Sequence, residues 1–67
     1  MSENLIEGIQ RQMNRARELV EEYKQIGTAG TFGRVMIEQD IREGEAAIAS
    51  GDVIRMMAAY KALEGCK

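Results

Sequence analysis

The sequence predicts an all-α protein, a small helical hairpin followed by a third, shorter helix. Three observations predict this class. Apolar residues recur at helical spacing in three segments, a glycine follows each segment, and no proline interrupts any of them. A chain of 67 residues forms one domain at most, so residues 1–67 are expected to fold as a single helical domain.

The first predicted helix spans about residues 3–26. Ser2 is a favourable N-cap residue, and Gly27 can take the left-handed conformation that ends a helix. The apolar residues of this segment alternate spacings of three and four, which is typical of a helix that packs along one stripe. This helix-1 stripe consists of Ile6, Ile9, Met13, Ala16, Val20 and Tyr23.

Two further helices are predicted over about residues 32–49 and 53–64. Thr31 is the preferred cap of the second helix and Asp52 the cap of the third, because both side chains can accept hydrogen bonds from free backbone amides. Gly65 ends the third helix. Connections of only a few residues turn successive helices back on one another, which predicts the hairpin.

Two glycines fall on the apolar stripe of the second predicted helix. A glycine inside a helix costs about 1 kcal/mol relative to alanine. Gly33 and Gly44 therefore indicate either that another helix approaches closely at these positions or that the helix is weak there.

The chain is expected to form a homodimer packed through the long first helix. The chain has few large apolar side chains to bury, and ordering each residue costs about 1.5 kcal/mol. The free energy of folding of one copy is therefore expected to be close to zero. Cys66 is the sole cysteine, so no internal disulfide can contribute. The helix-1 stripe then packs against a second copy. A monomeric three-helix bundle, whose other helices cover the stripe, is the alternative.

The cysteine content and the hydropathy predict a cytoplasmic protein. A single cysteine favours a reducing compartment, and no segment approaches the ~20 apolar residues of a membrane span. An acid, Glu3, stands where a signal peptide carries basic residues. Cys66 is expected to be an unreactive thiol in a frayed tail, and an intermolecular disulfide is the less favoured alternative.

The composition argues against an enzyme. Without histidine or tryptophan, and with one cysteine, the chain lacks most groups that bind metals or catalyse reactions near neutral pH. We expect no catalytic residue, no cofactor and no metal. A net charge of −2 also disfavours nucleic acid as a partner. A helix-turn-helix nucleic-acid binder, with Arg11 and Arg15 as its best phosphate contacts, is the alternative.

The second predicted helix carries a cluster of acidic residues. Four acids fall within residues 38–45, and Glu38 and Glu45, seven positions apart, share a helix face. Such a cluster can attract a basic partner, although acidic residues on a helix are often only solvated. We therefore name Glu38, Asp40 and Glu45 as candidate partner-binding residues.

A run of packing and turn motifs extends over the last two-thirds or so of the chain. It consists of Arg17-Glu18-Leu19, Tyr23, Ile26-Gly27, Ala29-Gly30, Phe32-Gly33, Met36-Ile37, Ile48-Ala49-Ser50-Gly51-Asp52-Val53, Met57, Ala59-Tyr60 and Leu63. In these motifs the sequence resembles the short helical proteins encoded in early regions of Mu-like transposable phages.

This resemblance implies a non-enzymatic protein that occupies a surface of a host protein. The group includes a quorum-sensing anti-activator protein, a small helical dimer that binds a LuxR-type transcription regulator and a type IV pilus assembly ATPase. The expected function is inhibition of such a host protein, whose basic surface meets the acidic side of the second helix. A structural or assembly homodimer of phage origin is the alternative.

Overall fold

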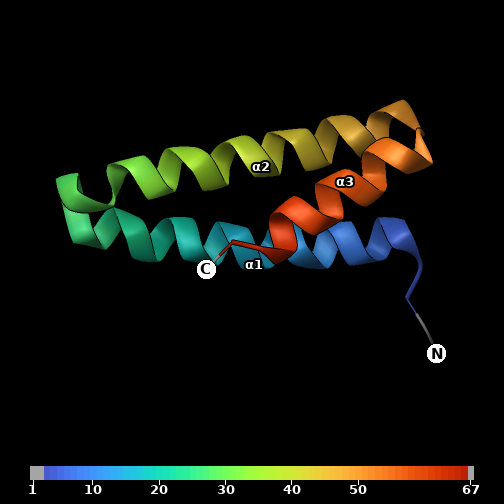
Figure 1. The fold of residues 1–67 in the computed structure, drawn as a ribbon. Helices are drawn as coiled ribbons and strands as arrows, with labels where there is room; N and C mark the ends of the chain where they lie inside the picture. The colour runs from blue at the N-terminus through green and yellow to red at the C-terminus, as the bar shows by residue number, and fades with distance from the viewer. Residues whose placement is uncertain (1–2, 67) are drawn as a thin grey trace.

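The computed structural model of the protein describes residues 3–66 and shows three α-helices. They are α1 (Leu5–Ile26), α2 (Thr31–Ser50) and α3 (Val53–Glu64), and a short 3₁₀ turn, η1 (Gly27–Gly30), joins α1 to α2. α1 and α2 form an antiparallel hairpin, and α3 returns along one side of it (Figure 1). The all-α hairpin with a short third helix is thus confirmed. The homodimer stays a prediction, because the structure is a single chain.

α1 begins at Leu5, not at residue 3, because Asn4 is its cap. The Asn4 side chain accepts a hydrogen bond from the Glu7 backbone N–H at 2.8 Å, and the Glu7 carboxylate accepts one from the Asn4 N–H at 3.1 Å. This capping box satisfies two backbone donors at the helix start. Ser2, the predicted cap, lies outside the described residues. Gly27, at φ 79°, ends the helix as predicted.

The connections of α2 also follow from local chemistry. Thr31 is the first residue of α2 and not its cap, because the η1 turn leads directly into the helix and Gly30 occupies the cap position without a side-chain bond. Gly51, in the left-handed conformation at φ 70°, ends α2. Asp52 caps α3 as predicted, and its carboxylate accepts from the Ile54 backbone N–H at 3.0 Å.

The hydrophobic core lies where the three helices meet. Ile9 of α1 and Leu63 of α3 are its largest fully buried side chains. Each large aliphatic side chain buried there contributes about 1.5–3 kcal/mol. The core residues are Ile9, Met13, Ala16, Val20, Ile37, Ile41, Ala47, Met56, Ala59, Leu63 and Cys66.

The helix-1 stripe belongs to this core, which corrects the expectation that it is free to pack against a second copy. Four of its six residues are buried within the single chain, namely Ile9, Met13, Ala16 and Val20. Tyr23 is half-buried, and Ile6 remains 41% exposed. α2 and α3 together cover the middle of α1, as in the alternative three-helix bundle. A dimer through this stripe would require the helices to separate.

Gly44 and Gly33 mark close approaches, which confirms the first of their two interpretations. A Cβ atom on Gly44 would lie 3.1 Å from the Met13 sulfur and 3.2 Å from a Leu63 methyl carbon, so α2 meets both other helices there. A Cβ atom on Gly33 would overlap the Tyr23 ring. The absence of a side chain at Gly33 therefore leaves room for the Tyr23 ring beside α2.

α3 covers one half of the hairpin only. Its contacts reach α1 between Gly8 and Arg15, and its end meets α2 at Asp40. Towards the η1 turn, the last turns of α1 and the first turns of α2 have no third helix beside them (Figure 1). We call this region, residues 16–26 of α1 with residues 31–39 of α2, the open half of the hairpin.

Candidate protein-interaction surface

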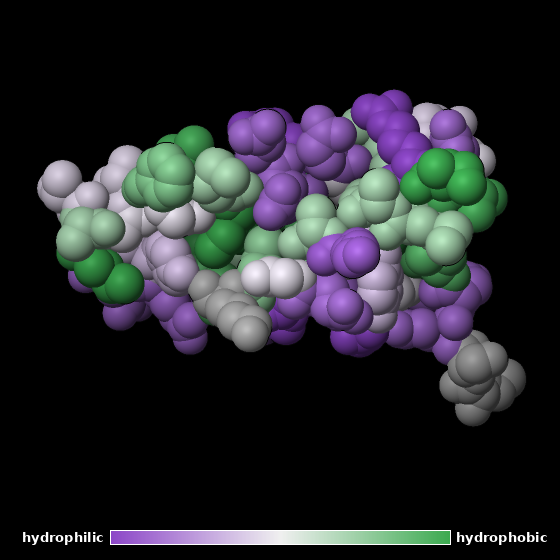
Figure 2. All heavy atoms as spheres, viewed as in Figure 1, coloured by the Kyte–Doolittle hydropathy of each residue, from purple (hydrophilic) through white to green (hydrophobic). Residues whose placement is uncertain are grey.

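Large apolar side chains remain exposed at both ends of the molecule. Phe32 is 79% exposed and Ile54 76% exposed, which is unusual for side chains of this size. The turn patch, beside η1, consists of Ile26, Phe32, Val35 and Met36. The α3 patch consists of Val53, Ile54 and Met57. Figure 2 shows apolar surface at both ends of the face that carries α3, with polar side chains between them.

The turn patch was not identified as a separate surface from the sequence. Phe32, Val35 and Met36 stand among the apolar residues of the second helix, and the sequence alone does not separate them from buried residues. In the structure they are exposed, whereas Ile37 and Ile41 are buried. The signal was present, because spacings of three and four from Phe32 define a stripe of their own on a different side of the helix.

A pocket of about 380 Å³ lies in the open half, next to the end of α3. Tyr23, Met36 and Ile37 line it from the hairpin, and Lys61 and Cys66 line it from α3 and the residues that follow. The turn patch and this pocket are continuous, because Met36 belongs to both. The open half therefore presents a largely apolar groove that ends at a charged side chain, Lys61.

Cys66 is buried at the inner wall of this pocket, which corrects the expectation of a frayed tail. Its thiol donates a hydrogen bond to the Asp40 carboxylate at 3.3 Å, and only 8% of the residue is exposed. Burial, and then the neighbouring Asp40 carboxylate, raises the pKa of the Cys66 thiol to about 11. Lys67, the last residue, lies outside the described residues.

We predict that Cys66 reacts slowly with alkylating reagents. The pKa of its thiol is raised from 9.0 to about 11, so the thiolate fraction at pH 8 is about 100-fold lower than in the unfolded chain. The rate of iodoacetamide alkylation should rise about tenfold for each pH unit up to about pH 11. Comparing native protein with protein in denaturant measures the difference, and equal rates in both states would contradict the prediction.

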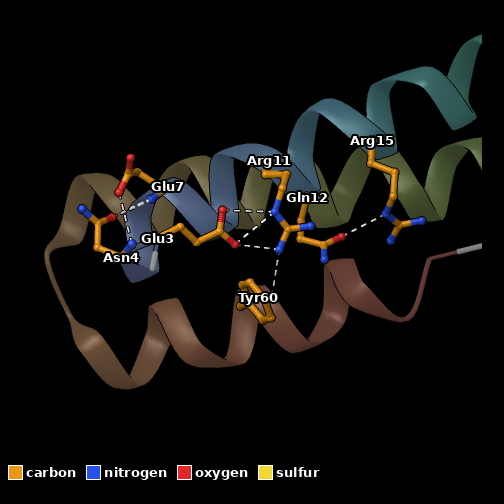
Figure 3. A network of polar contacts seen from close by, with 7 residues as sticks. All are labelled: Glu3, Asn4, Glu7, Arg11, Gln12, Arg15 and Tyr60. Carbon is orange, nitrogen blue, oxygen red and sulfur yellow. Dashed lines mark hydrogen bonds and ion pairs between the residues drawn. The ribbon is translucent and has the colours of Figure 1, made fainter. Parts of the chain in front are cut away.

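Arg11, one of the two candidate phosphate contacts, is held within the chain (Figure 3). Its guanidinium forms an ion pair with Glu3 at 2.7 Å and donates to the Tyr60 hydroxyl at 3.1 Å. The hydrogen bond from Arg11 lowers the pKa of the Glu3 carboxyl. Arg11 therefore connects the start of α1 to α3.

Arg15, the other candidate, joins α1 to the C-terminal end of α3. Its guanidinium donates to the carbonyl oxygens of Leu63 at 2.7 Å and Cys66 at 2.9 Å, and to the Gln12 side chain at 2.9 Å. The last carbonyls of a helix have no partner within it, and a cation interacts favourably with them. Both arginines have intramolecular partners, so a phosphate would have to replace these contacts, and the nucleic-acid alternative stays a prediction.

The structure does not bring the three candidate partner-binding acids together. Glu38 lies on the side of the hairpin away from α3, where it lines a groove with Arg17 and Arg42, and its carboxylate is 3.6 Å from Arg34. Glu45 is exposed and lies two helical turns further along the same side of α2. Asp40 faces α3 and its carboxylate accepts a hydrogen bond from the Cys66 thiol. A surface that binds through acids would use Glu38 and Glu45 without Asp40.

Comparison with protein-family models, curated proteins and solved structures finds no match to the chain. Within residues 3–66, no three histidine, cysteine, aspartate or glutamate side chains are grouped so that they could hold a metal ion. None of the helices in this part of the chain has the length and apolar character required to span a membrane. The feature with the clearest chemistry is the α3-bearing face with its two apolar patches.

Proposed function

We propose that the protein is a non-enzymatic binding protein that covers surfaces of other protein chains, including a second copy of itself. The observation that supports this function is the exposure of the turn patch and the α3 patch. Clustered apolar side chains on a small protein mark interaction sites, because water around them is released on binding. Aromatic residues such as Phe32 are frequent energetic centres of such interfaces.

For the target, we propose a host protein with a basic surface, as the resemblance to the Mu-like phage proteins implies. A LuxR-type transcription regulator or a type IV pilus assembly ATPase fits this description. The support from the structure is that Glu38 and Glu45 lie on the side of α2 away from α3. The ion pair of Glu38 with Arg34 is partly exposed and therefore weak, so a basic partner can replace it.

A pair of charge reversals tests this target surface. Glu38→Lys combined with Glu45→Lys is expected to weaken binding to the purified DNA-binding domain of a LuxR-type regulator at least tenfold, measured by titration calorimetry. The matched control is Glu18→Lys with Glu64→Lys, which changes the net charge equally on exposed positions elsewhere. If both double variants lose the same affinity for the regulator, the effect comes from the net charge and not from this face. If Glu38→Lys with Glu45→Lys binds as tightly as the wild type, this face is not the binding surface.

A structural homodimer without a host target is the second candidate, and the same apolar patches favour it. The two functions differ in what the wild-type protein does with purified partners. If the wild-type protein self-associates but binds neither the regulator nor the pilus ATPase, the structural homodimer is the function that remains.

A further inference from the structure

We infer that a second copy of the chain covers the α3-bearing face in an antiparallel arrangement, in which α3 of each copy lies in the open half of the other copy's hairpin. This inference rests on the proposed function, specifically on its claim of self-association, and it assigns the surface and the orientation. The helix-1 stripe is not involved.

The shape of the molecule supports this arrangement. α3 stands on one half of the hairpin and leaves the other half one helix lower (Figure 1). If two copies face each other with their long axes in opposite directions, the half that carries α3 in one copy meets the open half of the other. The α3 helix of each copy then takes the place where the other copy's open half has no third helix. If the copies ran in the same direction, the two α3 helices would collide while the two open halves stayed apart.

The chemistry of the two surfaces also matches. The outer side of α3 presents Ile54, Met57 and Ala58, together with the charged Lys61 and, seven positions after Met57, Glu64. Small side chains such as Ala58 allow close approach of another helix. These apolar residues are suited to the turn patch of the other copy, where Phe32 is the most exposed side chain.

Two acidic residues on the α3-bearing side of the open half have the opposite sign to Lys61. Glu22 is exposed on α1 and lies between the half-buried Leu19 and the exposed Ile26 on the same side of the helix. On α2, Asp40 lines the pocket at the inner end of this half. Lys61 of an incoming helix would therefore lie near Glu22 and Asp40, beside the Lys61 that already lines this pocket, and these contacts form twice in a twofold dimer.

The size of the face is sufficient for a stable dimer. The backbone measures 36 × 24 × 16 Å, so its broad face has about the extent of a standard interface, which is about 800 Å² per partner. Burial of the two patches would also supply the association energy that a chain of 67 residues needs beyond its own small core.

Site-specific cross-linking tests the orientation. In a Cys66→Ala background, Phe32→Cys and Met57→Cys variants are treated with a short bismaleimide separately and as a mixture. A covalent dimer is expected only in the mixture, because the antiparallel arrangement brings residue 32 of one copy near residue 57 of the other. A covalent dimer from either variant alone would overturn the inference, and so would no product in the mixture. Arg42→Cys, on the far side, is the control and should give none.

Sedimentation at micromolar concentration tests the surface independently. Phe32→Glu and Met57→Lys are each expected to shift the wild-type dimer to monomer with unchanged helicity, since both side chains are exposed within one chain. Combined in one chain, they are expected to restore the dimer, because the new charges attract across both contacts. A wild-type monomer, or single variants that remain dimeric, would overturn the inference. If the wild-type protein is a monomer and still binds the regulator, the proposed target stands and the dimer inference fails. If it is a dimer and binds neither the regulator nor the pilus ATPase, the proposed target fails and the dimer inference stands.

Discussion

Replacing Leu63 with alanine is expected to destabilise the fold by about 2–5 kcal/mol. Leu63 has no exposed surface, and one of its methyl groups lies against Gly44 at the point where α3 meets α2. Truncation removes buried apolar surface and leaves a cavity that the surrounding helices fill only in part. Because small domains have roughly 5–15 kcal/mol of stability in total, thermal and urea unfolding should show a large shift.

The control for this substitution is Val35→Ala. Val35 is also aliphatic and lies on a helix, but it is 47% exposed, so its truncation should change the free energy of unfolding by less than about 0.5 kcal/mol. Both measurements should be made at a protein concentration where the chain is monomeric, because Val35 belongs to the turn patch. A Leu63→Ala variant as stable as Val35→Ala would contradict the described packing of α3.

Replacing Arg15 with leucine is expected to cost about 2–3 kcal/mol. The Arg15 guanidinium donates to the carbonyl oxygens of Leu63, in the last turn of α3, and of Cys66, just after the helix. The Leu63 carbonyl also accepts from the Cys66 backbone N–H at 3.1 Å. Hydrogen bonds from a charged donor are among the stronger ones in proteins, and a leucine at position 15 can form none of them. Amide exchange in α3 should therefore accelerate more than exchange in α2.

Arg17→Leu is the matched control for Arg15→Leu. Arg17 is two residues away on the same helix, is exposed, and donates to the Asn14 side chain. Its replacement removes the same charge and is expected to change stability by less than about 0.5 kcal/mol. Equal destabilisation by both substitutions would show that the charge of α1, and not the contact with α3, matters.

The helix ends could be predicted from the sequence because they depend on local chemistry. Gly27 ends α1 at a positive φ, Gly51 ends α2 in the left-handed conformation, and Asp52 caps α3, each within a few residues of the position it determines. The start of α1 differed because Asn4 forms a capping box with Glu7, three residues later, whereas Ser2 was favoured on residue type alone. Local rules therefore fixed the elements to within a few residues.

The candidate surface was less predictable because it depends on contacts between distant residues. Nothing near Arg15 in the sequence indicates that its partners follow 48 residues later at Leu63. The second helix carries two apolar stripes, and only the packing of α1 and α3 decides that Ile37 is buried and Phe32 exposed. Likewise, the helix-1 stripe is mostly buried within one chain because α3 packs along α1, and no residue near the stripe in the sequence indicates this.

The close approach at Gly44 has a consequence for how the chain folds. At this glycine, the side chains of Met13 from α1 and Leu63 from α3 both lie against the backbone of α2, so all three helices meet there. A hairpin that lacked α3 would leave Ile9 and Met13 exposed to water on one side. Loss of α3 therefore also lowers the stability of the α1–α2 hairpin, so the folding of α3 and that of the hairpin are coupled.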